Sequence, residues 1–241
     1  MANNFFRFKQ FTVYQEMCGM KVGTDGVLLG AWCNVRDRKK VLDIGTGTGL
    51  IALMIAQRNA AVQVDALEID ADACRQATIN FESSPWGDRL HVLQNDFTDF
   101  AVAAPCKYDL IVSNPPYFEN SLKAGSQKRS QARHTDTLSY EDLLGHGASL
   151  LADEGVMALV FPIDVAAKIE ELALKNGLAC VRRVVVKGNP AVPPKRVLAE
   201  FARCSDTTAS SSATELIVEI QRHCYSDDYI ALTRDFYLKM E

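Results

Sequence analysis

The sequence predicts an α/β fold: a single domain with a doubly wound, mostly parallel, seven-stranded sheet and an antiparallel strand at its edge. Three observations predict it. Short apolar runs alternate with helical patterns along most of the chain, which is typical of a parallel sheet covered on both faces. A glycine-rich loop follows the first apolar run. The 241 residues are 48% hydrophobic and 23% charged, which suits one large globular domain.

The first half of the domain carries the clearest alternation. Strands are predicted at 41–44, 62–69, 90–93 and 108–112. Residues 50–57 are apolar nearly all round, as expected for a buried helix. Asp70 or Asp72 can cap the helix that follows the second strand. In a sheet of this kind the ligand binds at the carboxyl ends of the strands, so the residues just after each strand are the candidates for function.

The second half continues this pattern and then departs from it. Ser139, with Asp142 three residues later, resembles a capping box that opens a helix. A fifth strand is predicted at 156–161, followed by a helix that Asp164 caps and Asn176-Gly177 ends. The last predicted elements are strands at 178–186 and 215–220, joined mainly by a loop, and a short helix at 229–240. We therefore expect the last two strands to form the antiparallel pair at the sheet edge.

Composition and residue spacing constrain the domain organisation and the cellular compartment of the protein. No linker is apparent, so residues 1–35 are interpreted as an N-terminal extension and residues 36–241 as the main domain. The seven cysteines are scattered and never form a C-x-x-C pair, which argues against a disulfide framework or a zinc site. The four histidines also lack the spacing of metal ligands, so no metal is expected. Without a signal-peptide core or a bilayer-length apolar run, we expect a cytoplasmic protein with no membrane partner.

The loop after the first strand points to a nucleoside cofactor. Gly45, Gly47 and Gly49 let the backbone turn sharply and approach a ligand. Their spacing misses the dinucleotide fingerprint by one residue, and no P-loop lysine follows. Asp43 just before the loop disfavours a pyrophosphate and suits a cationic or zwitterionic ligand such as S-adenosylmethionine (SAM). Glu68, at the end of the second strand, is placed to accept hydrogen bonds from ribose hydroxyls.

Two alternatives stay open for this edge of the sheet. The loop could be an ordinary strand-to-helix turn beside an exposed acid, or part of a nicotinamide-dependent oxidoreductase, which its glycine spacing disfavours. Asp96 and Phe97 follow the third strand. An acid there could accept a hydrogen bond from the amine of an adenine, and the aromatic side chain could pack against the adenine ring. An ordinary aspartate in a turn is the simpler interpretation of Asp96 alone.

The tetrapeptide Asn114-Pro115-Pro116-Tyr117 ends the fourth strand at the same edge. Its two prolines fix the backbone and remove two N–H donors. A rigid array of acceptors remains: the Asn114 side-chain oxygen and the Pro115 carbonyl, with the aromatic face of Tyr117 beside them. Two acceptors that hold the two hydrogens of a planar aromatic amine draw its nitrogen toward tetrahedral geometry and free its lone pair for attack. The motif therefore predicts amine chemistry on a stacked ring.

These motifs resemble the amino-methylating branch of the class I SAM-dependent methyltransferases, a Rossmann-like fold. The stretches Phe8–Phe11, Met20–Trp32 and Phe236–Lys239 are similar to the bacterial tRNA1(Val) (adenine37-N6)-methyltransferase family, and the similarity runs essentially end to end. The resemblance implies transfer of a methyl group from SAM to N6 of the adenine immediately 3′ of the tRNA anticodon. It also implies that the N-terminal extension closes over the cofactor.

The resemblance implies the following site residues. The methionine and ribose parts of SAM would be held by Asp43, Gly45, Gly47, Gly49 and Glu68, and its adenine by Asp96 and Phe97. Lys21, Thr24 and Asp25 would belong to the segment that closes over the cofactor. Asn114, Pro115, Pro116 and Tyr117 would be catalytic and would hold the target base, with Asn114 also beside the cofactor. The alternatives are adenine-N6 or glutamine-N5 methylation of ribosomal RNA, DNA or protein, or a non-catalytic RNA-binding module.

Binding of an anticodon loop requires a local basic patch, because 26 basic and 30 acidic residues leave a net charge of −4. The predicted tRNA-contacting residues are Lys123, Lys128, Arg129, Arg133, Lys195 and Arg196. The first four belong to a polar loop just after the Asn-Pro-Pro-Tyr motif, and the last two follow a proline-rich turn. A solvated surface run is the alternative for each of them.

Overall fold

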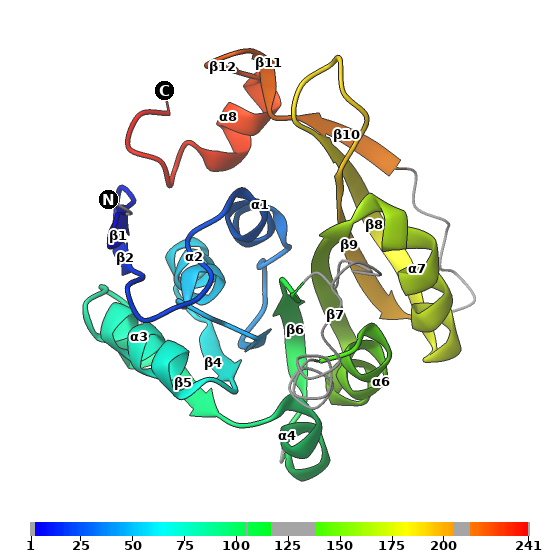
Figure 1. The fold of residues 1–241 in the computed structure, drawn as a ribbon. Coiled ribbons are helices and arrows are strands. Elements are labelled where there is room, and N and C mark those ends of the chain that lie inside the picture. Colours follow the sequence, from blue (N-terminus) through cyan, green and yellow to red (C-terminus); the bar gives the residue numbers. More distant parts are fainter. Residues whose placement is uncertain (1–2, 105, 117–137, 205–212, 241) are drawn as a thin grey trace, which may run out of the picture.

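An eight-stranded sheet forms the centre of the structure (Figure 1). The structure is a computed structural model that describes residues 3–104, 106–116, 138–204 and 213–240. In chain order the strands are β3 (Lys40–Ile44), β4 (Gln63–Glu68), β5 (Leu90–Gln94), β6 (Tyr108–Ser113), β7 (Leu151–Pro162), β8 (Leu178–Lys187), β9 (Arg196–Arg203) and β10 (Ala213–Ile217). Their order across the sheet is β10-β8-β9-β7-β6-β3-β4-β5.

Helices cover both faces of this sheet, as Figure 1 shows. On one face lie α1 (Thr24–Trp32), α2 (Leu50–Arg58), α3 (Ala71–Glu82) and α8 (Asp227–Thr233). On the other lie α4 (Phe97–Ala103), α6 (Tyr140–Leu150) and α7 (Ala166–Lys175). Residues 50–56 of α2 are buried all round because the helix is packed between α1 and the sheet. The predicted doubly wound α/β architecture is therefore confirmed.

The prediction for the sheet edge is wrong in two respects. The sheet has eight strands, and its antiparallel strand is β9, which lies inside the sheet between β7 and β8. The two late strands expected to form an antiparallel pair, β8 and β10, instead pair in parallel, with Leu216 opposite Val186. The chain crosses back through β9 before it reaches the edge, so β8 and β10 run in the same direction.

β9 escapes detection because a charged residue interrupts its apolar run. Glu200 lies between Ala199 and Phe201, yet its residue is only 4% exposed. Its carboxylate accepts a hydrogen bond from the Asn34 backbone N–H at 2.7 Å and lies 3.4 Å from the Arg182 guanidinium. A buried carboxylate with such partners is tolerated in a central strand. Only the tertiary structure supplies those partners.

Most helix boundaries follow the predicted capping residues. The Asp70 side chain accepts from Ala73 N at the start of α3, and the Ser139 side chain accepts from Asp142 N at the start of α6. Gly177, with a φ of 72°, ends the α7 region as predicted. Asp164 does not cap a helix, because it lies within a short 3-10 turn, Ile163–Val165, that precedes α7. The last helix starts at Asp227 and ends at Thr233, earlier than predicted.

The two ends of the chain lie side by side (Figure 1). β1 (Phe5–Arg7) and β2 (Thr12–Tyr14) form a hairpin, and in the turn between them Lys9 N donates to Phe236 O, near the other terminus, at 2.8 Å. A second small hairpin, β11 (Glu219–Gln221) with β12 (Cys224–Tyr225), and a 3-10 turn at Gly87–Arg89 complete the elements. Within the described ranges, no helix has the length and apolar character needed to cross a bilayer.

Candidate functional site

The carboxyl ends of β3, β4 and β6 bring the predicted site residues to one edge of the sheet. The Ser113 hydroxyl at the end of β6 donates to Ile44 O at the end of β3, at 2.8 Å, and so joins the two strand ends. Gly45, Gly47 and Gly49 all have positive φ, a conformation that favours glycine. A Cβ at Gly45 or Gly47 would meet nothing within 4 Å, so the loop backbone faces open space there.

Asp43 is the most unusual group at this edge. It is fully buried, and the Thr46 hydroxyl donates to its Oδ2 at 2.7 Å. Among the described residues, Oδ1 has no hydrogen-bond partner. Burial raises the pKa of Asp43 from its ordinary value of 3.8 to about 7, and the Thr46 hydroxyl offsets part of that rise. A cation or a hydrogen-bond donor is the kind of partner that would satisfy the unpaired oxygen of this carboxyl.

Glu68 organises the backbone around the same loop. Its Oε2 accepts from Gly47 N at 2.9 Å, and its Oε1 accepts from Ile69 N at 2.9 Å and Asp70 N at 3.1 Å. Glu68 thus links the glycine loop to the start of α3, a role that the sequence did not predict. A carboxylate has about four acceptor sites, so these three bonds leave capacity for a ligand hydroxyl.

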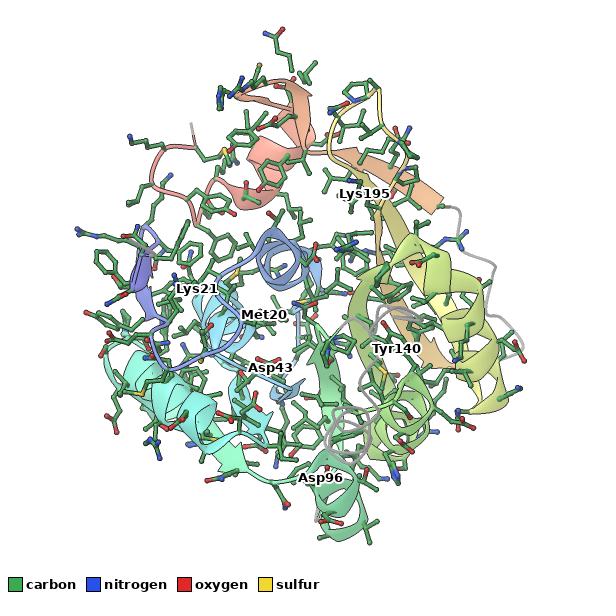
Figure 2. All side chains as sticks on the ribbon, in the orientation of Figure 1. Met20, Lys21, Asp43, Asp96, Tyr140 and Lys195 are labelled. Atoms are coloured by element: carbon green, nitrogen blue, oxygen red, sulfur yellow. The ribbon has the colours of Figure 1, made fainter. Side chains whose placement is uncertain are left out.

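Asp96 and Phe97 have structural roles at the start of α4. Asp96 Oδ1 caps the helix by accepting from Thr98 N at 2.7 Å and Asp99 N at 3.2 Å. Phe97 is 5% exposed and packs edge-on against His146 in the core. Figure 2 shows Asp96 at the start of α4, below Asp43. Their predicted contact with an adenine stays a prediction.

The Asn-Pro-Pro-Tyr motif begins directly after β6. Asn114 is half-buried, Pro115 is buried and Pro116 is exposed, so the motif starts at the sheet edge and leads out to the surface. Tyr117 lies outside the described residues. The same holds for four of the predicted tRNA-contacting residues: Lys123, Lys128, Arg129 and Arg133.

The first turn of α1 lies close to the glycine loop. A Cβ at Gly26 would be 3.1 Å from Leu50 Cδ2, so α1 packs tightly on the start of α2, one residue beyond Gly49. Thr24 and Asp25 belong to that first turn. Figure 2 shows Met20 and Lys21, which precede α1, on one side of Asp43. Lys21 is exposed, and its ammonium donates to Asn3 O at 3.5 Å.

Tyr140 and Lys195 lie across from Met20 and Lys21 in Figure 2. Next to Lys195, the Arg196 Nε donates to Asp25 Oδ2 at 2.9 Å. One residue predicted to bind tRNA and one predicted to cover the cofactor are therefore in direct contact. This ion pair joins α1 to the start of β9 and is roughly three-quarters buried on the Asp25 side, whose side chain is 23% exposed. In the part of the chain that the structure describes, no cluster of His, Cys, Asp and Glu could hold a metal ion.

Sequence reasoning missed three buried amide side chains that bond to the N-terminal segment: Gln15, Gln76 and Asn80. Asn80 Nδ2 donates to Thr48 O within the glycine loop at 2.8 Å. Gln76 and Asn80 are four residues apart on α3 and share a face with Ala77. This helical spacing of two amides on an apolar face was the sequence signal that could have identified them. Apart from Thr48, the bonding partners of Gln76 and Asn80 come from the N-terminal segment, which only the fold brings to α3.

Known proteins resemble the chain over its full length. The family model described as "Methyltransferase small domain" matches residues 22–175. Proteins named tRNA1(Val) (adenine(37)-N6)-methyltransferase are 49% identical in Parabacteroides distasonis over 240 residues and 46% identical in Trichodesmium erythraeum over 241 residues. The first comparison covers 100% of both chains, and the second covers 99% of this chain and 100% of the relative.

Solved structures show the same fold at low sequence identity. A predicted O-methyltransferase from Agrobacterium tumefaciens has a TM-score of 0.69 at 18% identity and covers 88% of this chain and 96% of its own. The methyltransferase subunit of a type I restriction-modification system from Streptococcus thermophilus has a TM-score of 0.63 at 17% identity. That comparison covers 89% of this chain and 52% of the subunit.

Proposed function

The chain belongs to the tRNA1(Val) (adenine(37)-N6)-methyltransferase family, and we propose that it transfers a methyl group from SAM to N6 of adenine 37 in the anticodon loop of tRNA1(Val). The observation that carries this proposal is full-length similarity at 49% identity, together with an intact Asn114-Pro115-Pro116-Tyr117 motif in the sequence directly after β6. Because the proposed substrate is a tRNA, we propose that the protein acts in the cytoplasm.

The residues of the loop fit SAM. Asp43 offers a buried carboxyl with an orphaned oxygen, which suits a cation or an N–H donor. Gly45 and Gly47 leave room for a ligand to approach the backbone, and Glu68 retains acceptor capacity for ribose hydroxyls. When bound there, SAM supplies an electrophilic methyl group on a positively charged sulfur. Thr24, Asp25 and Lys21 are proposed to cover it, and Asp96 and Phe97 to flank its adenine.

The chain's own contribution to the chemistry is positioning. We expect the Asn114 side-chain oxygen and the Pro115 carbonyl to accept the two hydrogens of the target amine, while Tyr117 stacks on the adenine ring. The rigidity of the two prolines keeps both acceptors in place without reorganisation. Holding two reactants in line supplies most of the rate acceleration in such a transfer, of the order of 7–11 kcal/mol for well-oriented groups.

An anticodon loop suits this site because its bases are single-stranded. A base must leave its stack to reach the acceptors, which costs a few kcal/mol and least in a single strand. We propose that Lys195 contacts the tRNA backbone, together with Lys123, Lys128, Arg129 and Arg133. Arg196 would act partly through its ion pair with Asp25, which holds α1 beside the loop.

The test is methylation of tRNA that lacks the modification, followed by mass spectrometry of its nucleosides. We expect N6-methyladenosine at position 37 of tRNA1(Val). Asn114→Ala should abolish transfer and leave the affinity for SAM nearly unchanged, with thermal unfolding as the control for folding. Label incorporated only into protein, ribosomal RNA or DNA would overturn the substrate assignment. Tight binding of NADH without binding of SAM would overturn the chemistry as well.

A further inference from the structure

We propose that Gln76 and Asn80, on the buried face of α3, are positioning residues of the cofactor site that clamp the N-terminal segment 14–22 against the glycine loop. This inference rests on the proposed function. The two side chains are 1% and 0% exposed, and they lie one helical turn apart. Both bond to backbone atoms outside α3, and those atoms belong to the two pieces of chain that meet at the site.

Asn80 connects three parts of the fold. Its Nδ2 donates to Tyr14 O at 2.8 Å and to Thr48 O at 2.8 Å, and its Oδ1 accepts from Tyr14 N at 2.8 Å. Tyr14 is the last residue of β2, and Thr48 belongs to the glycine loop. One fully buried amide therefore sets the distance between the N-terminal hairpin and the loop that faces the cofactor.

Gln76 and Gln15 continue the attachment toward α1. Gln76 Oε1 accepts from Met17 N at 3.1 Å. Gln15 is 5% exposed; its Oε1 accepts from Val22 N at 2.9 Å, and its Nε2 donates to Asn3 O at 2.9 Å. The segment is thus held by side-chain amides at Tyr14, Met17 and Val22, immediately before α1 begins.

Between these anchors lie Cys18, Met20 and Lys21. Cys18 is half-buried, and burial together with the negative charges of Glu68 and Asp70 raises its pKa to about 11. Met20 is 59% exposed, and in the view of Figure 2 it is drawn between Lys21 and Asp43. An exposed apolar side chain and a cation at the rim are groups that can contact a bound nucleoside.

A purely apolar face of α3 would pack equally well without the cost of burying two amides. The amides instead fix an irregular segment that has few backbone ladder bonds of its own, because β1 and β2 are only three residues each. When the amides are removed, the segment and the loop are free to separate, and cofactor binding must then supply the ordering free energy. The expected signature is weaker binding of SAM with little change in turnover once SAM is saturating.

Two variants test the clamp. Gln76→Met removes the acceptor for Met17 N–H at nearly constant length, and Asn80→Ala removes all three bonds to Tyr14 and Thr48. The matched control is Asn59→Ala at the opposite ends of the strands. Asn59 also makes three backbone bonds, to Val35 O, Arg38 O and Ala61 N.

Three quantities are measured for each variant. Calorimetry gives the affinity for SAM, steady-state assays with the tRNA substrate give kcat and KM, and amide hydrogen exchange is followed on the protein without cofactor. We expect each clamp variant to weaken SAM binding about tenfold, which is about 1.4 kcal/mol, with kcat at saturating SAM changed less than about twofold. The amides of Tyr14, Met17 and Val22 should exchange faster in the clamp variants. Asn59→Ala should lower the melting temperature without changing the SAM affinity.

Equal loss of SAM affinity in Asn59→Ala and Asn80→Ala would overturn the clamp, because it would show that only global stability matters. Unchanged affinity in Gln76→Met, which is the variant expected to fold most readily, would overturn it as well. Failure of the unsubstituted protein to bind SAM would instead overturn the proposed function. Restored affinity in Gln76→Glu, which keeps an acceptor for Met17 N–H, would support the clamp.

Discussion

The buried carboxyl of Asp43 makes protein stability depend on pH in a defined window. Its pKa is raised to about 7 by burial, whereas the same carboxyl in the unfolded chain titrates near 3.8. The folded state therefore binds the proton more tightly than the unfolded state does. A raised folded-state pKa adds stability that is fully present below the unfolded pKa and is lost as the pH rises through the folded pKa.

The magnitude follows from the two pKa values. Each unit of difference corresponds to about 1.4 kcal/mol, so the total loss, from well below pH 3.8 to well above pH 7, is roughly 4 kcal/mol. Asp43→Asn removes the titration and leaves the neighbouring Thr46 hydroxyl a partner. The free energy of unfolding of the variant, minus that of the unsubstituted protein, should therefore rise by roughly 3 kcal/mol from pH 4 to pH 7.

Urea unfolding of both proteins in the absence of cofactor, at half-unit steps from pH 4 to pH 8.5, measures this difference. Subtracting one profile from the other cancels the titration of every other group. The difference should level off above about pH 7.5, where the carboxyl is ionised in both states. A difference that stays constant across the whole range would refute the reasoning, because Asp43 would then titrate alike in the folded and unfolded chains.

Three further predictions concern stability and tRNA binding. Gly49→Ala should lower the free energy of unfolding by about 2–4 kcal/mol in urea titrations, because φ is +80° there and the new Cβ would lie 2.9 Å from Phe81 Cζ. The control is Gly19→Ala, where a Cβ would meet nothing within 4 Å, and it should change the free energy of unfolding little. Glu200→Ala should cost about 1–3 kcal/mol by calorimetric melting, because it leaves a backbone N–H and the Arg182 guanidinium without their buried acceptor; an unchanged melting temperature would contradict this. Replacing the polar-loop cations together should weaken tRNA binding and reduce the slope of log K against log salt by about 2, and an unchanged slope would remove them from the interface. The residues replaced are Lys128, Arg129 and Arg133.

The architecture was readable from the sequence where local patterns decide it. The apolar runs that became β3, β4, β5 and β6, the glycine loop and the caps at Asp70 and Ser139 depend on neighbouring residues, and all were predicted correctly. The residues after each strand converge because parallel strands place their carboxyl ends at one edge. Asp43 and Glu68 could therefore be assigned to one site without coordinates.

The rest depended on contacts between residues far apart in the chain. β9 was missed because Glu200 breaks its apolar run. The carboxylate of Glu200 is satisfied by the backbone N–H of Asn34, 166 residues away in the chain, and by the guanidinium of Arg182 on the neighbouring strand. The same reason hides the attachment of the N-terminal segment, since the bonds from Asn80 reach Tyr14 across 66 residues. The sequence alone therefore determined which residues lie at the strand ends, because residue type and local spacing suffice for that placement. The tertiary structure alone decided which buried polar groups hold that chemistry in place, because a polar side chain can be buried only where the fold brings it a partner.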